Sequence, residues 1–145
     1  MKTRITTLLC VFFVAAVSYA ADVITCDIAK LPESARAYIA QNFAKTPVNA
    51  IKIDKDWFSI DEYEVFLSDG TKVEFDGTGV FKSAKNRAGL PSSVIPKEVA
   101  DCISKNYAGN KIVELEVKKY GYKVKLSDSS ELKVFGKGVP VCVED

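Results

Sequence analysis

Histidine does not occur anywhere in this 145-residue chain. Its absence removes the commonest metal ligand and the commonest general base of enzymes that work near neutral pH. Serines are plentiful, but a catalytic nucleophile needs an activating base beside it, and no Ser–Lys pair stands out. The adjacent carboxylates Asp61 and Glu62 are typical of solvated strand or turn residues. The sequence therefore predicts a protein without enzymatic activity and contains no candidate catalytic residue.

Recognisable metal-binding motifs are also scarce. Asp54-x-Asp56 and Asp76-Gly77-Thr78-Gly79 look like fragments of calcium loops, yet neither fits the twelve-residue loop that closes with a glutamate. Both segments are better interpreted as turns. We expect no metal site and no cofactor.

Long stretches of one charge sign and long apolar segments are absent as well. Basic and acidic residues are interspersed, so the chain lacks the basic stripe that is typical of a nucleic-acid-binding protein. The apolar run Leu8–Val17 has ten residues, too few to cross a bilayer, and no later run is longer. We expect no membrane span and no nucleic-acid partner.

The apolar run near the N-terminus has the pattern of an export signal. Lys2 and Arg4 precede it, and Ser18-Tyr19-Ala20 supplies small residues where a signal peptidase reads. We expect residues 1–20 to be removed, which leaves 18 basic and 19 acidic residues. A lipid-anchored Cys10 is a weaker alternative, because a lipoprotein cysteine should end such a run. The mature chain is long enough for one compact domain or for two small halves that share a core.

Three cysteines follow the expected cleavage site: Cys26, Cys102 and Cys142. An exported protein can oxidise two of them, and three single pairings are possible. Cys102 falls on the apolar stripe of a predicted helix, which favours an inert core thiol. A Cys26–Cys142 bridge would tie down the N-terminal arm, and free or differently paired thiols are the alternative.

One hairpin sequence occurs twice. Residues 63–81 read YEVFLSDGTKVEFDGTGVF, residues 122–140 read YKVKLSDSSELKVFGKGVP, and eight of the nineteen positions are identical. The repeat extends to two amphipathic segments, LPESARAYIAQNFA at 31–44 and IPKEVADCISKNYA at 95–108. The offset falls from 64 residues there to 59 at the hairpin, so the first copy carries five extra residues around Trp57.

The spacing of apolar residues predicts one helix and about four strands in each copy. Both amphipathic segments have a helical apolar stripe behind a first-turn proline, Pro32 or Pro96. The remainder alternates with period two, as in a sheet with one buried and one open face. The predicted buried sets include Tyr63, Val65 and Leu67 in the first copy and Val139, Val141 and Val143 in the second.

These residues resemble the PepSY-like family of small exported proteins, also called β-lactamase-inhibitor-like. The resemblance covers roughly residues 30–143, and YEVFLSDGTKVEFDGTG is its most specific part. The resemblance implies an α+β fold of two tandem units, each with one helix and a four-stranded antiparallel sheet, which together form one curved sheet. It also implies a location in the envelope of a Gram-negative bacterium, most simply the periplasm, with secretion as the alternative. We expect a first repeat at 21–88, with an N-terminal arm, and a second at 89–145. Ser129 and Phe135 depart from the pattern, where the first copy has Gly70 and Asp76.

Large apolar side chains at strand positions that should face away from the core mark the candidate site. Phe66 and Phe135 lie between inward-facing positions and should point away from the helices, and Lys125 occupies the slot that matches Phe66. The inserted segment contributes Trp57 and Phe58, and Tyr120 lies at the matching connection of the second copy. Aromatic side chains on an open sheet face can anchor a partner. The alternative is that these rings pack on one another, on the other unit or under the N-terminal arm.

We therefore expect a non-enzymatic exported binding protein. Its partner would be an envelope protein or peptide on the open face, and inhibition of a hydrolase is one form that this could take, by fold analogy only. The alternative is a sensor or carrier of a small molecule, with a pocket between the repeats near Trp57. The sequence does not indicate an oligomeric state.

Overall fold

A computed structural model describes residues 22–136 and 141–144. The predicted signal peptide, residues 1–20, lies outside the described residues. Of the helices that are described, none is long and apolar enough to cross a membrane.

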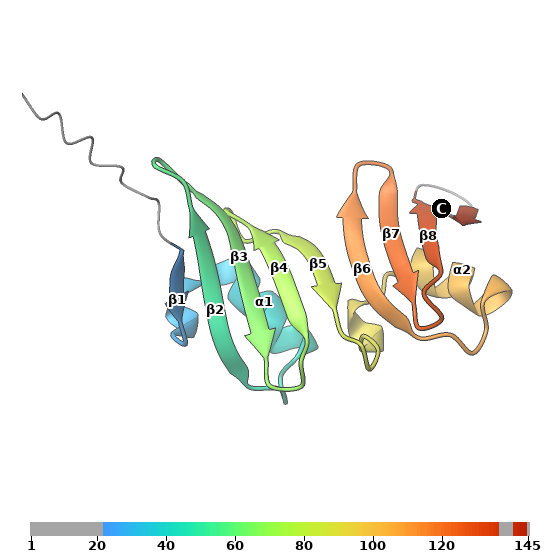
Figure 1. Ribbon diagram of the computed structural model, residues 1–145, viewed down its shortest axis with the longest axis horizontal. Coiled ribbons are helices and arrows are strands. Elements are labelled where there is room, and N and C mark those ends of the chain that lie inside the picture. Colours follow the sequence, from blue (N-terminus) through green and yellow to red (C-terminus); the bar gives the residue numbers. More distant parts are fainter. Residues whose placement is uncertain (1–21, 137–140, 145) are drawn as a thin grey trace, which may run out of the picture.

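Nine antiparallel strands form one sheet, in which neighbours in sequence are neighbours in space from β1 to β9 (Figure 1). The first part contains β1 (Val23–Thr25), η1 (Ile28–Lys30), α1 (Glu33–Asn42), β2 (Val48–Lys55), β3 (Ile60–Leu67), β4 (Lys72–Asp76) and β5 (Phe81–Lys85). The second contains η2 (Ser92–Val94), α2 (Lys97–Asn106), β6 (Ile112–Lys118), β7 (Gly121–Leu126), β8 (Glu131–Phe135) and β9 (Val141–Glu144). The expected α+β class and the open antiparallel sheet are confirmed, and β1 adds a strand that the sequence pattern did not predict.

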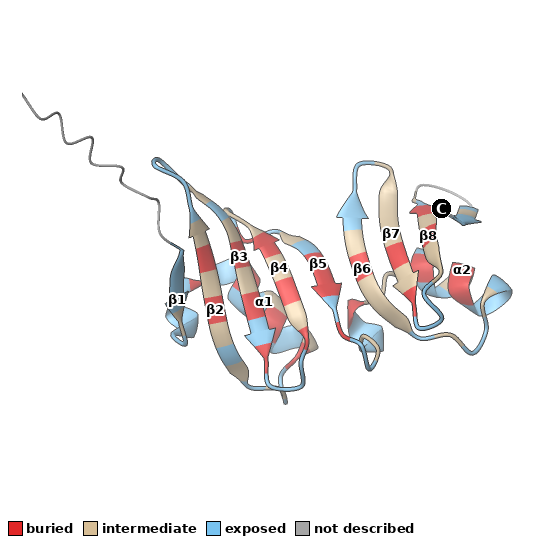
Figure 2. Ribbon diagram, in the orientation of Figure 1, coloured by how far each residue is buried: buried red, intermediate tan, exposed pale blue. Residues whose placement is uncertain are grey.

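Both α-helices lie on the same side of the sheet, and the core is between them and the strands (Figure 1). Period-two alternation sends Tyr63, Val65 and Leu67 of β3 into this core, as predicted, and all three are buried. Bands of buried residues along the strands in Figure 2 follow the same alternation. Pro32 and Pro96 directly precede the helices, where a missing N–H costs least.

An aromatic cluster fills the core under α1. The ring of Phe75, which is fully buried, meets Tyr38 edge-on at 5.6 Å between centroids, and Tyr38 stacks on Phe81 at 4.7 Å. Burial raises the pKa of Tyr38 to about 12. The cluster joins one face of the helix to strands β4 and β5.

The matching hairpin turns have the same backbone form although their residues differ. Gly70 has φ +86°, and its N–H donates to the Leu67 carbonyl at 3.1 Å. Ser129 takes the equivalent place with φ +76°, and its N–H donates to the Leu126 carbonyl at 3.0 Å. A left-handed conformation is strained for serine, so the second copy retains the turn at a backbone cost.

The last strand corrects two sequence predictions. Val139, Val141 and Val143 were expected to face the core. Val139 lies outside the described residues, Val141 and Val143 are 52% and 47% exposed, and Cys142 packs inward instead. Cys142 forms a disulfide with Cys102 of α2, with 6.2 Å between their Cα atoms. The predicted Cys26–Cys142 bridge and the free core thiol at Cys102 are therefore wrong. Cys26 is exposed, and its thiol donates to the Asn49 carbonyl at 3.2 Å.

Candidate functional site

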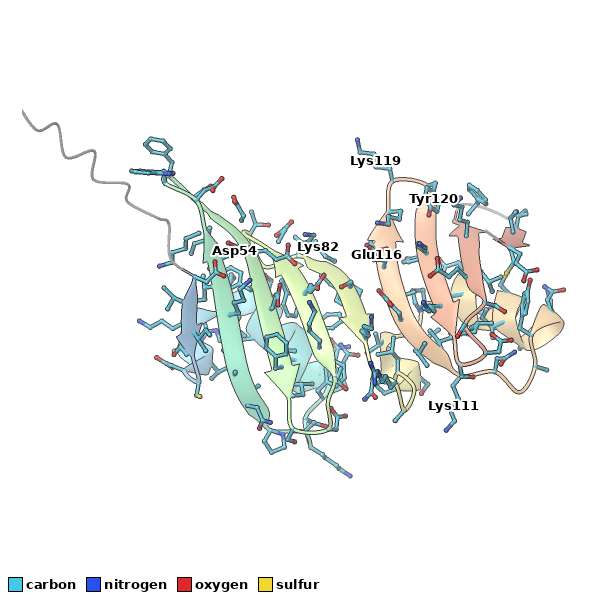
Figure 3. All side chains as sticks on the ribbon, in the orientation of Figure 1. Asp54, Lys82, Lys111, Glu116, Lys119 and Tyr120 are labelled. Carbon is cyan, nitrogen blue, oxygen red and sulfur yellow. A yellow bond between two sulfur atoms is a disulfide. The ribbon has the colours of Figure 1, made fainter. Side chains whose placement is uncertain are left out.

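Charged side chains cover the face of the sheet that lies opposite the helices (Figure 3). The strand register sets them in rows that cross the sheet. One row contains Lys52, Glu64, Glu74, Ser83, Glu116, Lys123 and Lys133. The next contains Phe66, Lys72, Lys85, Glu114, Lys125 and Glu131. We call this surface the open face.

Lysines and glutamates on the first half of the open face neutralise one another. Lys72 pairs with both Glu64, at 3.5 Å, and Glu74, and Glu62 pairs with Lys82 at 2.9 Å. Partial burial opposes ionisation of Glu74, but hydrogen bonds from Lys72 and Ser83 outweigh it and hold the pKa of Glu74 below its usual range. The charged side chains on this half of the open face therefore form a network of ion pairs, which we call the ion-pair network.

The second half repeats this arrangement with its own residues. Glu131 accepts hydrogen bonds from Lys123 at 2.8 Å and Lys125 at 3.2 Å, and these lower the pKa of its carboxyl. Lys85 of β5 pairs with Glu114 of β6 at 3.3 Å, across the junction between the two halves. Lys125, a predicted site residue, thus lies on the open face as part of the ion-pair network.

Three carboxylates of the ion-pair network lie close enough to share a cation. One oxygen each of Glu62, Glu64 and Glu74 falls within 4.8 Å of the others. Hard oxygen ligands of this kind suit calcium or magnesium. Lys72 and Lys82 already occupy the same carboxylates, so the positive charge that a metal would supply is largely present.

The predicted aromatic residues do not form one patch. Phe66, 37% exposed, lies on the open face beside Lys72, whose Nζ is 6.0 Å from the ring centroid. Phe135, 40% exposed, lies on the other half, where its ring meets Tyr120 at 5.3 Å. The structure therefore brings Tyr120 and Phe135 together and leaves Phe66 apart from them.

Trp57 and Phe58 lie away from the open face, at the tip of the hairpin between β2 and β3. The tip is closed by a hydrogen bond from the Asp56 N–H to the Ser59 carbonyl at 3.0 Å. The two rings are 67% and 101% exposed. The inserted residues thus lengthen this hairpin beyond the one between β6 and β7.

Two shallow hollows lie on the helix side of the sheet. One, of about 460 Å³, borders α2 and is lined by Leu90, Ile95, Ile103, Tyr107 and Ile112, among others. The other, of about 470 Å³, lies between the halves and shares Leu90 and Ile112. Trp57 lines neither hollow. Sequence reasoning missed these residues, because an apolar residue that lines a hollow has the same periodicity as one that fills a core.

Replacing Glu74 with glutamine should lower the free energy of unfolding by about 1 kcal/mol at pH 7. The pKa of Glu74 is lower in the folded chain, so its contribution is complete above the unfolded pKa of about 4.3. It is lost as the pH falls through the lower folded value. Urea denaturation should show a smaller difference in stability between wild type and variant at pH 3 than at pH 7.

The control for this experiment is Glu144→Gln, an exposed glutamate at the end of β9. It should change stability by less than about 0.5 kcal/mol at either pH. An equal loss for both variants at pH 7 would contradict the view that the ion pairs of Glu74 stabilise the fold.

Solved structures of relatives have the same fold. A "putative periplasmic protein of unknown function" from Bacteroides vulgatus is 36% identical, with 77% of this chain and 90% of the other covered and a TM-score of 0.70. A "putative calcium-regulated periplasmic protein" from Bacteroides thetaiotaomicron is 30% identical, with 86% and 96% covered and a TM-score of 0.76. A further "putative periplasmic protein" from Bacteroides vulgatus is 28% identical, with 86% and 96% covered and a TM-score of 0.74.

Comparison with curated proteins gives no match. The model of one protein family, described as "Putative beta-lactamase-inhibitor-like, PepSY-like", matches residues 20–61 and 61–139. These two segments contain both α-helices and strands β1 to β8. The chain therefore belongs to the PepSY-like, β-lactamase-inhibitor-like family.

Proposed function

We propose that this protein is a non-enzymatic periplasmic binding protein that holds a protein or peptide partner on its open face. The observation that carries the proposal is the breadth of that face, since nine strands are joined edge to edge and both α-helices lie on the other side (Figure 1). The location is supported by the relatives, whose descriptions name periplasmic proteins. The signal-like pattern of residues 1–20 agrees with it.

The breadth of the face is best explained as the product of a tandem duplication. Each α-helix is preceded by a proline and followed by four strands, and β5 pairs with β6 across the junction. A unit of about 55 residues would have a marginal core on its own. Residues 21–88 and 89–145, as two such units, would share one core and present one continuous surface.

The chemistry of the open face favours a protein or peptide over a small molecule. Phe66 and Phe135 offer partly exposed rings on separate halves, too far apart in the register for one small ligand to use both. The ion-pair network around them supplies hydrogen-bond donors and acceptors that can set specificity for a partner. Inhibition of a hydrolase is one form of this function, in analogy with the family name.

Calcium regulation, which the description of one relative includes, is not part of the proposal. Three lysines, Lys52, Lys72 and Lys82, lie within 4.0 Å of the carboxylates of Glu62, Glu64 and Glu74. Lys72 and Lys82 pair closely with these carboxylates, and Lys52, which pairs more closely with Asp22 at 3.1 Å, contributes less, so the lysines offset most of the negative charge that would attract a divalent cation. A cation would first have to displace these lysines.

A pull-down from periplasmic extract tests the proposal. The double variant Phe66→Ala, Phe135→Ala should lose a partner that the wild type captures, because each buried anchor contributes about 2 kcal/mol, about thirtyfold in affinity. Trp57→Ala is the control: it removes an exposed ring that lies off the open face, and it should retain the partner. Equal capture by wild type and double variant, or no partner for either, would refute the assignment of the face.

A further inference from the structure

Two neighbouring hollows lie on the open face at the junction of the two halves, beside the end of β5. One, of about 380 Å³, is bordered by β5, β6, β7 and the turn after β7. The other, of about 340 Å³, is bordered by β4, β5 and the turn after β3. Lys85 and Arg87 line both hollows, so these two side chains lie where the hollows meet. We call the two hollows together the junction groove.

A buried asparagine holds the chain in place at the junction groove. Asn86 is 7% exposed, and its side-chain N–H donates to Thr71 Oγ1 of the first half at 2.7 Å. Its backbone N–H donates to the Val113 carbonyl of the second half at 2.9 Å, and its side-chain oxygen accepts from the Ala88 N–H at 2.8 Å. Since these bonds fix the backbone on both sides of Arg87, the cost of ordering this residue around a ligand is lowered.

Cations outnumber carboxylates among the residues that line the junction groove. The charged lining residues are four cations and two carboxylates: Lys72, Lys85, Arg87, Lys125, Asp69 and Glu114. Asp69 accepts a hydrogen bond from the Thr71 N–H inside its own turn at 2.9 Å, and Glu114 pairs with Lys85 at 3.3 Å. Of the residues that the structure describes, none forms an ion pair with Arg87. The groove therefore has an excess of positive charge, and Arg87 is available to a ligand.

The strand register adds a repulsion at the same place. Lys72 of β4 lies directly opposite Lys85 of β5, and like charges in this position destabilise a sheet. On the neighbouring strands, Glu64 lies opposite Glu74, and Lys72 pairs with both of them. The two lysines have no comparable bridge, because Lys85 pairs with Glu114 instead. A carboxylate of a ligand in the groove would relieve the repulsion between them.

The surrounding charges favour a short acidic segment over a long polyanion. Glu64, Glu74 and Glu131 lie on the strands that flank the groove, so a nucleic acid or a phosphate-rich lipid surface would meet repulsion on both sides. One or two carboxylates would match the small excess of positive charge in the groove. The planar guanidinium of Arg87 suits a carboxylate, to which it can donate two parallel hydrogen bonds.

We propose that the junction groove binds the carboxylates of an acidic segment of a protein or peptide, with Arg87 as the central contact. This inference rests on the proposed function, because it names the chemistry of the partner on the open face. The first copy of the hairpin has Phe66 at the position of Lys125, so the duplication does not repeat this charge in the first half. An acidic segment would therefore fix the orientation of the partner across the face.

An NMR titration of the chain that begins at Ala21 tests the inference, since every described element lies after this residue. The probes are a capped tetraglutamate peptide and a capped tetraglutamine peptide. Tetraglutamate should shift the amide resonances of Lys85, Arg87 and Lys125, and tetraglutamine should not. Affinity for tetraglutamate should fall as the salt concentration rises. Arg87→Gln should weaken binding about tenfold, because the variant loses the charge-assisted hydrogen bonds of the guanidinium.

The matched control is Arg36→Gln, which removes the same charge from an exposed position of α1 on the other side of the sheet and should keep the wild-type affinity. Equal weakening by both variants, or no resonance shift with tetraglutamate, would overturn the inference. So would tighter binding of inorganic phosphate than of tetraglutamate at the same ionic strength, which would make the groove a phosphate site.

This titration and the pull-down described above can fail separately. A titration without binding removes only the acidic chemistry of the partner and leaves the result of the pull-down unchanged. A pull-down without any partner refutes the proposed function even where the acidic peptide binds in the groove.

Discussion

Replacing Phe75 with alanine should lower the free energy of unfolding by about 3–5 kcal/mol. The ring is fully buried and contacts both other members of the aromatic cluster, Tyr38 at 5.6 Å and Phe81 at 6.4 Å between centroids. Truncation removes these contacts and leaves a cavity between α1 and the sheet, which the surrounding strands can fill only in part. Urea denaturation followed by circular dichroism measures the loss.

Phe66→Ala is the control for this prediction, because it removes the same ring from the neighbouring strand but from the other face. Phe66 is 37% exposed, so its truncation should cost less than about 1 kcal/mol. The comparison separates the buried face of the sheet from the open face. Similar losses for the two variants would mean that both faces are covered, which would also remove the basis of the proposed binding surface.

Which strand residues share a face of the sheet could be predicted from the sequence, because this depends only on their spacing along the strand. Successive side chains of a strand point to opposite faces, so Tyr63, Val65 and Leu67 must share one face wherever the strand lies. The same rule placed Phe66 on the open face, where it is found. The order of the strands that hairpins join can be predicted from the short connections, since a hairpin of a few residues leaves antiparallel neighbours no other arrangement. The pairings of β1 with β2 and of β5 with β6 cannot, because a helix lies between the strands of each pair.

Side-chain periodicity misled where the pattern itself was ambiguous. In the segment Val141-Cys142-Val143, valine and cysteine are both apolar, so alternation identifies two sets without showing which one faces the core. The three-dimensional position of Cys102 decides between them, because it brings a second thiol to the inner side of β9. A contact between residues 40 positions apart has no local signal.

The assembly of the candidate site also lay beyond local reasoning. Parity correctly predicted that Phe66 and Phe135 face outward, but not that they lie on separate halves of a nine-stranded sheet. Trp57 and Phe58 were assigned to the same surface because they fall in the inserted segment. The structure extends that segment along the strands, so both rings project beyond the end of the sheet. The distance between two side chains on different strands depends on the order of all the strands in the sheet. The alternation of residues within one strand contains no information about that distance.

Reducing the disulfide between Cys102 and Cys142 should lower the free energy of unfolding by roughly 3–4 kcal/mol. The bond closes a loop with a sequence separation of 40 residues, so it removes considerable freedom from the unfolded chain. It also ties α2 to β9, a strand of four residues at the edge of the sheet, whose pairing with β8 is its main other support. In the periplasm, the location that we propose, oxidising conditions keep such a bond formed.

Thermal denaturation with and without a reductant measures this contribution, and Cys142→Ser should reproduce the effect of the reductant. Cys26→Ser is the matched control: its thiol is exposed, so the variant should keep the wild-type stability and the same sensitivity to reduction. Alkylation of the native chain from Ala21 should modify one thiol, and alkylation after reduction should modify three, as counted by mass. Modification of three thiols without reduction, or a loss of stability confined to Cys26→Ser, would show that the chain is not cross-linked between α2 and β9.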